Sequence, residues 1–384
     1  MTGMKPFWAV SLTHMFVEVY YLTQVALIPT FIREFNLSLL ETSLVATVPS
    51  FVQLLANLPS GYLSERLTTR QLLFASMVTE GLSAFLVSRA DDFWVLVLGV
   101  SAMRLCSPIY HISGLSRISH IVGPEKVNRS MGFHNALGSF GSAIGLIVLS
   151  VFQSTIGWRW TYTFWAFPIL AWGFLVLRTE ELGTGVQDGG GNKMGLSNLT
   201  SVLSTAFMVF IIAIGFNCMG LTGIQTYMTT YLVEVRGLTD SMASLIFGLG
   251  PFIGIMGALN GGYMGEKMGP KKALGLVIIC SAVSILFLML LSPFYLLLIA
   301  YLAYMFFSSS VWSPMNSIVT NITPKIGRGF SYSVYFLTEG VVVSITPTIM
   351  AAAIGLSEIW FIFPFSMIFM VMGLIVLQIV SCPR

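Results

Sequence analysis

The segment Gly61-Tyr62-Leu63-Ser64-Glu65-Arg66-Leu67 is matched 201 positions later by Gly262-Tyr263-Met264-Gly265-Glu266-Lys267-Met268. The similarity runs without a gap over residues 36–74 and 237–275, and it places Arg70 opposite Lys271. A long-period repeat in a very apolar chain indicates two related membrane halves, with a binding site where the halves meet. The repeat therefore makes a transporter the first hypothesis.

The composition places the chain in a membrane. It is 55% hydrophobic and only 9% charged, whereas soluble domains have roughly 25% charged residues. A helix needs about 20 mostly apolar residues to cross the hydrocarbon layer. Such segments occur at 7–28, 41–63, 71–89, 93–117, 129–153, 158–177, 201–233, 240–263, 271–291, 293–319, 329–352 and 358–380. We therefore predict an all-α membrane protein with twelve transmembrane helices.

Several other classes of protein are disfavoured. The four cysteines, Cys106, Cys218, Cys280 and Cys382, show no paired spacing, so we predict neither disulfides nor a zinc site. The chain lacks a Gly-x-x-x-x-Gly-Lys-Ser/Thr motif for ATP, and it shows no nucleophile–base pair. We predict a protein that is not an enzyme, with no cofactor, no metal and no nucleic-acid partner. The first apolar segment contains Glu18 and lacks a small-residue cleavage signature, so we expect a retained helix rather than a signal peptide.

Basic residues define the expected orientation. With the N-terminus inside, the inner connections hold fourteen of them: Lys5, Arg66, Arg70, Arg117, Lys126, Arg129, Arg178, Lys193, Lys267, Lys271, Lys272, Lys325, Arg328 and Arg384. The outer connections hold four: Arg33, Arg89, Arg159 and Arg236. The positive-inside rule then places both termini in the cytoplasm, which an even number of spans also requires.

One long connection divides the chain. It contains Asp188-Gly189-Gly190-Gly191-Asn192, which is polar and rich in glycine, as flexible tethers are. We predict an N-terminal six-helix bundle at 1–178, a cytoplasmic linker at 179–200 and a C-terminal six-helix bundle at 201–384.

This layout and the duplicated loop resemble the major facilitator superfamily, whose signature loop reads Gly-x-Leu-x-Asp-Arg-x-Gly-Arg-Arg. In the first copy Glu65 replaces the Asp and Thr68 replaces the second Gly, whereas the second copy keeps Gly269 and continues with Pro270. The resemblance implies two pseudo-symmetric bundles that work by alternating access. We expect the loops to form a cytoplasmic latch, in which the two acids pair with basic residues; an ordinary basic loop is the alternative. The latch residues are Gly61, Glu65, Arg66, Arg70, Gly262, Glu266, Lys267 and Lys271.

A narrower resemblance is to the fosmidomycin-resistance branch of drug exporters. It is based on His14-x-x-x-Glu18, Tyr110-His111 and the glycine-rich segment that begins at His134. Glu18 replaces the branch's Asp, and Ile112 stands in place of its Pro. Proton-coupled drug antiporters also often have an arginine in helix 4, where this chain has Arg104 without the Gln-Gly that usually follows.

Four charges, Glu18, Glu80, Arg104 and Glu339, lie well inside predicted spans. Each costs roughly 2.5–3.5 kcal/mol at a helix centre, so each is a functional candidate. His14 and Tyr21 lie near Glu18 on the first helix, and His111 shares a helix face with Arg104. In the family fold both helices line the central cavity. We hypothesise that Glu18 and Arg104 face one another and exchange partners during transport; a permanent structural ion pair is the alternative.

The second half offers mainly uncharged polarity. Asn217 and Gln225 are expected cavity residues of its first helix. Glu339 is expected to be a second proton site, a partner for a cationic substrate, or a packed, hydrogen-bonded carboxyl. Glu80 lies in a helix that is peripheral in the family fold, so we expect it to be structural. Two glycine stripes predict close helix packing; their members are Gly138, Gly141 and Gly145, and Gly250, Gly254, Gly257 and Gly261.

We therefore predict a secondary transporter of the inner (cytoplasmic) membrane that moves a small amphipathic or anionic molecule. Proton-coupled export is expected, with protons and the lipid bilayer as further partners, and the protein is expected to be monomeric. Uptake of an organic anion or metabolite is the alternative within this class. A membrane sensor that resembles a transporter but moves no substrate is the alternative outside it.

Overall fold

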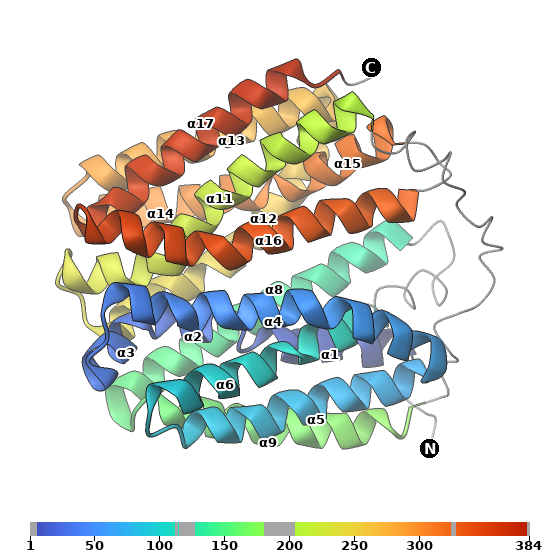
Figure 1. The fold of residues 1–384 in the computed structure, drawn as a ribbon, viewed down its shortest axis with the longest axis vertical. Helices are drawn as coiled ribbons and strands as arrows, with labels where there is room; N and C mark the ends of the chain where they lie inside the picture. Colours follow the sequence, from blue (N-terminus) through green and yellow to red (C-terminus); the bar gives the residue numbers. More distant parts are fainter. Residues whose placement is uncertain (1–5, 112–113, 115–126, 180–203, 324–327, 382–384) are drawn as a thin grey trace. The chain divides into compact units, whose positions relative to one another are not determined.

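The computed structural model describes residues 6–111, 114, 127–179, 204–323 and 328–381, apart from the side chains of residues 58, 61, 64–65, 127–132 and 328–333. Helices make up the described part, without a strand (Figure 1). They are α1 (Pro6–Glu18), α2 (Thr23–Ala26), α3 (Ile28–Phe35), α4 (Leu39–Arg66), α5 (Thr69–Ser88), α6 (Phe93–Arg104), α8 (Val127–Thr155), α9 (Arg159–Val176), α11 (Thr205–Glu234), α12 (Asp240–Met268), α13 (Pro270–Leu290), α14 (Phe294–Ser309), α15 (Trp312–Ile322), α16 (Arg328–Gly355), η2 (Ile359–Phe361) and α17 (Ile362–Ile379).

Ten of these helices are long and apolar enough to cross a membrane, or eleven if one bent pair counts as a single span. The bent pair is Pro6–Ala26 with Ile28–Glu34, which meet at 53°. Helix α9 is not among them, because Arg159 and its three tryptophans make it less apolar. The all-helical membrane fold is confirmed. The count of twelve and the orientation of the termini stay predictions.

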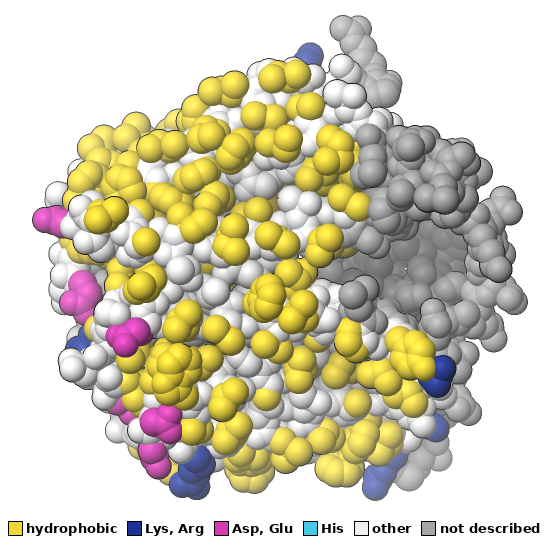
Figure 2. Space-filling model, in the orientation of Figure 1, with side chains coloured by type: hydrophobic (Ala, Val, Ile, Leu, Met, Phe, Trp, Pro, Cys, Tyr) yellow, Lys and Arg dark blue, Asp and Glu magenta, His cyan; other side chains and the backbone are white. Residues whose placement is uncertain are grey.

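Figure 2 shows that hydrophobic side chains cover most of the face in view, while the acidic and basic groups lie near its margins. Large apolar side chains such as Leu98, Phe167, Leu259 and Ile375 are more than half exposed. In a spanning protein, such side chains face lipid rather than water.

The chain forms two compact units. The first comprises Met1–Gly189 and Leu232–Gly248, and the second comprises Gly190–Tyr231 and Leu249–Arg384. The hairpin Leu232–Gly248, made of the end of α11 and the start of α12, thus belongs to the first unit. The predicted boundary at 200 falls among residues 180–203, which lie outside the described part, and the boundary at 178 lies just before them.

Polar contacts attach this hairpin to the rest of the first unit. Asp240 forms an ion pair with Arg33 and accepts a hydrogen bond of 2.6 Å from Thr30. Ser241 and Ser150 exchange hydrogen bonds of 2.8 Å through their hydroxyl and carbonyl groups. The attachment is therefore polar.

Glycines allow main chains to touch in both units, as their stripes predicted. A Cβ atom at Gly141 or Gly145 of α8 would lie 2.0 Å from a carbonyl oxygen of the first span. In the second unit, a Cβ atom at Gly257 or Gly261 of α12 would lie 2.1 Å from the carbonyl oxygen of Phe306 or Ser310. Real Cβ atoms do not approach so closely, so these helix contacts require glycine.

The departures of the duplicated loop from the family signature have local explanations. Thr68 is the N-cap of α5 and forms a capping box with Gln71, which satisfies two main-chain donors. At the equivalent place before α13, Gly269 adopts φ +85°, where a side chain would be strained. Helix α5 thus begins with a side-chain cap from Thr68, whereas α13 begins after a backbone conformation of Gly269 that favours glycine.

Basic residues after the loops bind main-chain oxygens near the end of each unit. Arg70 Nη1 donates to the carbonyl of Thr179 at 3.4 Å. Lys271 Nζ donates to the carbonyls of Val380 at 2.7 Å and Gln378 at 2.9 Å. Val380 follows Thr179 by the same 201 positions that separate Lys271 from Arg70. The internal repeat thus extends to these hydrogen bonds.

Candidate functional site

The first span is interrupted beside its charged residue. Helix α1 ends at Glu18 and α2 begins at Thr23, and between them the carbonyls of Glu18 and Tyr20 accept from amides three residues on instead of four. The carbonyl of Tyr21 accepts hydrogen bonds from Arg104 Nη2 at 2.8 Å and from Gln24 Nε2 at 3.0 Å. The guanidinium of Arg104 also lies 4.5 Å from the centre of the Tyr21 ring. Arg104 therefore stabilises the break in the first span.

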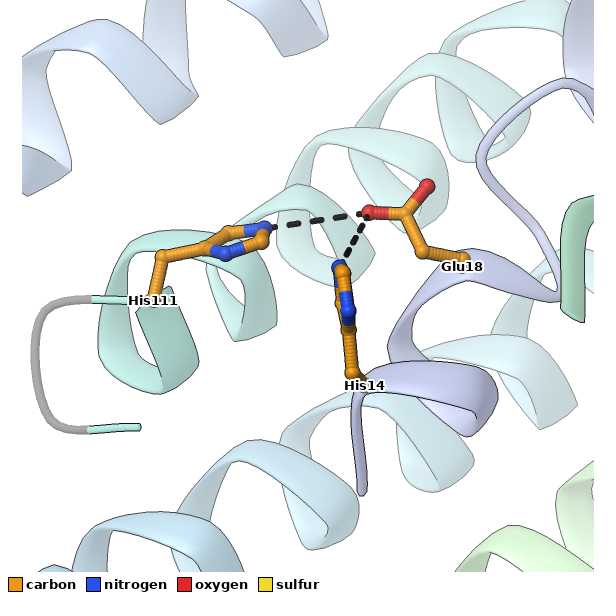
Figure 3. Close-up of side chains that lie close together, drawn as sticks. All are labelled: His14, Glu18 and His111. Atoms are coloured by element: carbon orange, nitrogen blue, oxygen red, sulfur yellow. Dashed lines mark ion pairs between the residues drawn. The ribbon is translucent and has the colours of Figure 1, made fainter. Parts of the chain in front are cut away.

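Glu18 lies between two histidines (Figure 3). Its Oε1 is 3.6 Å from Nε2 of His14, one turn earlier on α1, and 3.7 Å from Nε2 of His111. His111 lies at the end of the helical segment Phe93–His111, whose first part is α6. The side chain of Glu18 is only 16% exposed, so this contact lies largely away from solvent.

The orientation of the His14 ring is fixed by contacts with α8. Its Nδ1 lies 3.1 Å from the carbonyl oxygen of His134. A carbonyl only accepts, so Nδ1 must carry a hydrogen, and Nε2 carries one only when the ring is cationic. The ring is also stacked on that of His134, with centroids 4.3 Å apart. A Cβ atom at Gly138 would lie 2.5 Å from Cε1 of His14, so glycine makes room for the ring.

The second oxygen of Glu18 and a small cavity complete the site. Ser142 Oγ lies 3.4 Å from Glu18 Oε2 and 3.2 Å from the Glu18 carbonyl. Glu18, Glu80 and Arg104 line one small cavity of about 10 Å³, which has room for roughly one water molecule. Its other lining residues are Val17, Tyr20, Tyr21, Gln24, Val100, Met103, Cys106 and Ser107.

The structure brings together all five predicted residues of the first half, in two groups. His14, Glu18 and His111 form one group, and Tyr21 with Arg104 forms the other. Among the described ion pairs, none joins Glu18 to Arg104. The two side chains instead line the same cavity and have different partners. The hypothesis that they exchange partners stays a prediction.

The predicted residues of the second half belong to the other unit. Asn217 on α11 is fully buried, and neither atom of its amide has a hydrogen-bond partner within the described part. Glu339 on α16 likewise has one buried carboxyl oxygen, Oε2, without a hydrogen-bond partner within the described part. Gln225 is half-buried on α11, two turns after Asn217.

The latch is described only in part, because the side chains of Gly61 and Glu65 lie outside the described residues. Glu266 is exposed, and no ion pair within the described residues includes it. Arg66 and Lys267 lie over the rings of Tyr62 and Tyr263, at 4.2 and 5.6 Å. A Cβ atom at Gly262 would lie 3.5 Å from Ser313 Oγ, and Arg70 and Lys271 bind the main-chain oxygens described above. The ionic latch stays a prediction.

Sequence reasoning left three contributors out of the site: Glu80 was expected to be structural, His134 was noted only as the start of the glycine-rich segment, and Ser142 was not singled out. His134 supplies the carbonyl that orients His14, and its own ring contacts Tyr110 Oη at 3.1 Å and Ser11 Oγ at 3.3 Å. Ser142 contacts Glu18, and Glu80 lines the cavity. Their spacing held a signal: His134, Gly138, Ser142 and Gly145 lie three or four residues apart, which places them on one face of α8.

A cation can be shared within the first group. His14, Glu18 and His111 each present one nitrogen or oxygen within 4.8 Å of the others. This spacing suits a proton that moves among the three groups, and it would equally suit a metal ion. The sequence-based expectation of no metal stays a prediction.

Known proteins agree with this architecture. The family model described as Major Facilitator Superfamily matches residues 10–347, and again 255–381. A probable sugar efflux transporter of Pasteurella multocida (strain Pm70) is 26% identical over 235 residues, 58% of each chain. A nitrite extrusion protein of Bacillus subtilis (strain 168) is 24% identical over 252 residues, 65% of this chain and 62% of that protein. These matches thus span about three fifths of the relatives' lengths.

A solved structure resembles the whole chain. The bacterial homologue of the human lysosomal transporter Spinster, in an inward-facing and unoccupied conformation, matches with a TM-score of 0.79. The match covers 98% of this chain and 95% of that one, at 15% identity. This likeness concerns the fold. With a family model that matches most of the chain, the protein belongs to the Major Facilitator Superfamily.

Proposed function

We propose that this transporter exports a small anionic or amphipathic molecule and is driven by protons. The observation that carries the proposal is the contact between Glu18 Oε1 and Nε2 of His14. Since Nδ1 of His14 faces a carbonyl, the contact with Glu18 is favourable only when one of the two groups holds an additional proton. The cluster thus has a built-in place for a proton, and His111 offers a second base beside it.

Arg104 supports an anionic substrate. Among the described residues that line the cavity, it is the one basic side chain, and its present partners are the carbonyl and ring of Tyr21. An anion that replaced the carbonyl would gain a charge-assisted hydrogen bond. The nitrite extrusion protein is named for a small anion, and the sugar efflux transporters are named for export. Together these names support export and, in one case, a small anion.

The wider proposal follows the sequence. We place the protein in a cytoplasmic membrane, as a monomer with both termini inside, six helices on each side of the linker and a latch at the duplicated loops. Alternating access between the two bundles moves the substrate. Protonation of the Glu18 cluster accompanies one direction of the change and deprotonation accompanies the other.

The test begins with ligand discovery. The purified protein is heated with nitrite, with benzoate or with a disaccharide, at two pH values, and a ligand is recognised by a raised melting temperature. That ligand is then followed in liposomes with and without an imposed pH gradient. We expect the gradient to increase accumulation by the wild type.

Glu18→Gln isolates the proton step, because glutamine keeps the shape and removes the titrating group. We expect it to lower gradient-driven transport by roughly tenfold or more, the effect of about 1.4 kcal/mol. Glu358→Gln, at an exposed acid, is the matched control and should transport normally. Undiminished gradient-driven transport by Glu18→Gln would reject the proposed role of the cluster.

A further inference from the structure

A second buried acid lies beside the site and has no part in the cluster described above. Glu80 on α5 is fully buried. Neither of its carboxyl oxygens accepts a hydrogen bond from a nitrogen or oxygen atom of the described residues. The thiol of Cys106, a weak donor, lines the same cavity. Sequence position alone suggested a structural acid, but a structural acid would be expected to have stronger partners.

Glu80 faces a shared space rather than a packed interface. Its side chain lines the cavity with Glu18 of α1 and Arg104 of α6. Helix α5 packs against α1, α6 and α9, and these helices supply the neighbouring titratable groups. They are Glu18 of α1 and Tyr20 of the break that follows it, Arg104 and Cys106 from the α6 segment, and Tyr162 of α9, which is stacked on Tyr20.

The surroundings suit Glu80 with its proton. An ionised carboxylate without a partner in such a place costs several kcal/mol, whereas the neutral acid does not carry this penalty. The present arrangement is therefore one in which the acid keeps its proton. A partner with a positive charge would reverse this preference.

That partner is available within the same cavity. Arg104 is the one basic side chain among the described lining residues, and it is held by a main-chain carbonyl and an aromatic ring instead of by an acid. An arginine side chain has several rotatable bonds, so its guanidinium can leave Tyr21 and turn toward α5. An arginine that alternates between a neutral and an acidic partner would control whether the acid is ionised.

We propose that Glu80 is a second proton-carrying residue of the transport cycle, governed by Arg104. When Arg104 exchanges the Tyr21 carbonyl for the Glu80 carboxyl, the O–H bond of Glu80 breaks and its proton passes to water in the cavity. When Arg104 returns to Tyr21, the carboxylate takes a proton back. The inference rests on the proposed proton coupling, but it concerns a different residue and a different helix from the Glu18 cluster.

Infrared difference spectroscopy tests this without a known substrate. A protonated carboxyl has its own C=O stretching band, and the purified wild type should show such bands at neutral pH. Glu80→Gln should remove one of them. Glu339→Gln, which changes a buried acid of the other unit, is the control and should leave that band in place.

Arg104→Gln provides the second variant. Without the guanidinium, the band assigned to Glu80 should persist to higher pH, with its midpoint raised by about one pH unit or more. If Glu80→Gln does not fold, Glu80→Asp, which keeps a carboxyl group but displaces its band, assigns the band instead. The proposal is overturned if Glu80→Gln retains every carboxyl band, or if the midpoint is the same with and without Arg104.

The two proposals fail separately. Loss of the Glu80 band in a protein that shows no gradient-driven transport would reject proton coupling and retain Glu80 as a proton-binding group. Suppose instead that gradient-driven transport depends on Glu18, but the carboxyl bands of Glu80→Gln are the same as those of the wild type. That result would reject the Glu80 inference alone.

Discussion

At the scale of single residues, His14 shows how main-chain contacts prepare a side chain for its role. The His134 carbonyl determines which nitrogen of His14 carries hydrogen, and Gly138 leaves room for the ring. The other nitrogen is thereby directed at Glu18. Neither feature is a titrating side chain: one is a main-chain carbonyl and the other is a missing Cβ atom. Such positioning is therefore difficult to infer from side-chain types alone.

Two substitutions at His14 separate its two contacts. Asparagine places its amide nitrogen near the position of Nδ1, and glutamine reaches nearer that of Nε2. We expect His14→Asn to keep a melting temperature near that of the wild type and to lose gradient-driven transport by roughly tenfold. His14→Gln should lose more stability, because the buried His134 carbonyl is then left without its donor. Equal melting temperatures for both variants would contradict this division of roles.

At the scale of helices, apolar segments predicted most elements to within a few residues. The predicted segments 71–89 and 271–291 correspond to Thr69–Ser88 and Pro270–Leu290. The break at residues 19–22 was not predicted, because Val19-Tyr20-Tyr21-Leu22 has no glycine or proline to mark it. That break engages Arg104 through a carbonyl, so the arginine lies near Glu18 without pairing with it.

The glycine contacts give a prediction about helix packing. In Gly141→Ala the new methyl group would overlap the Met15 carbonyl, so α1 and α8 must separate, and overpacking of this kind costs about 1–3 kcal/mol. Gly265→Ala is the control, since nothing lies within 4 Å of its added Cβ atom. We expect a clearly lower melting temperature for the first variant and an unchanged or higher one for the second. Comparable losses in both would show that the α1–α8 contact is adaptable.

The duplicated loops should respond unequally to the same kind of change. Gly269→Ala forces a side chain into φ +85° and should destabilise the protein by about 1–2 kcal/mol. Thr68→Gly removes a capping side chain but tolerates the main-chain conformation, so a loss of only a few tenths of a kcal/mol is expected. Thermal unfolding of both variants in one detergent measures the difference. A larger loss for Thr68→Gly would contradict the assigned helix starts.

At the scale of the whole molecule, the hairpin Leu232–Gly248 is part of the first unit although its two helices continue into the second. Its ion pair with Arg33 is partly exposed, and exposed pairs contribute only about 0.2–1 kcal/mol. Contacts of this strength can form and break repeatedly. A hairpin held by them is suited to a protein that changes conformation with every cycle.

Hydrogen exchange can detect this attachment. Asp240→Asn weakens the contacts with Arg33 and Thr30, so we expect faster amide exchange over residues 232–248 and a nearly unchanged melting temperature. Glu34→Gln is the control, because Glu34 pairs with Arg159 and Trp158 within the first unit. It should leave exchange in the hairpin unaltered. Unchanged exchange in Asp240→Asn would show that the hairpin is held by its apolar side chains instead.

The hydrogen bonds of Arg70 and Lys271 to main-chain oxygens have a consequence for the evolution of the two halves. Every amino acid supplies a carbonyl, so Thr179 and Val380 can occupy equivalent places although their side chains differ. A change of side chain at an accepting position therefore leaves this hydrogen bond intact. Only the basic residue type at the donating position is constrained by it. Duplicated proteins built on such bonds can diverge until one short loop is the last visible trace of their common origin.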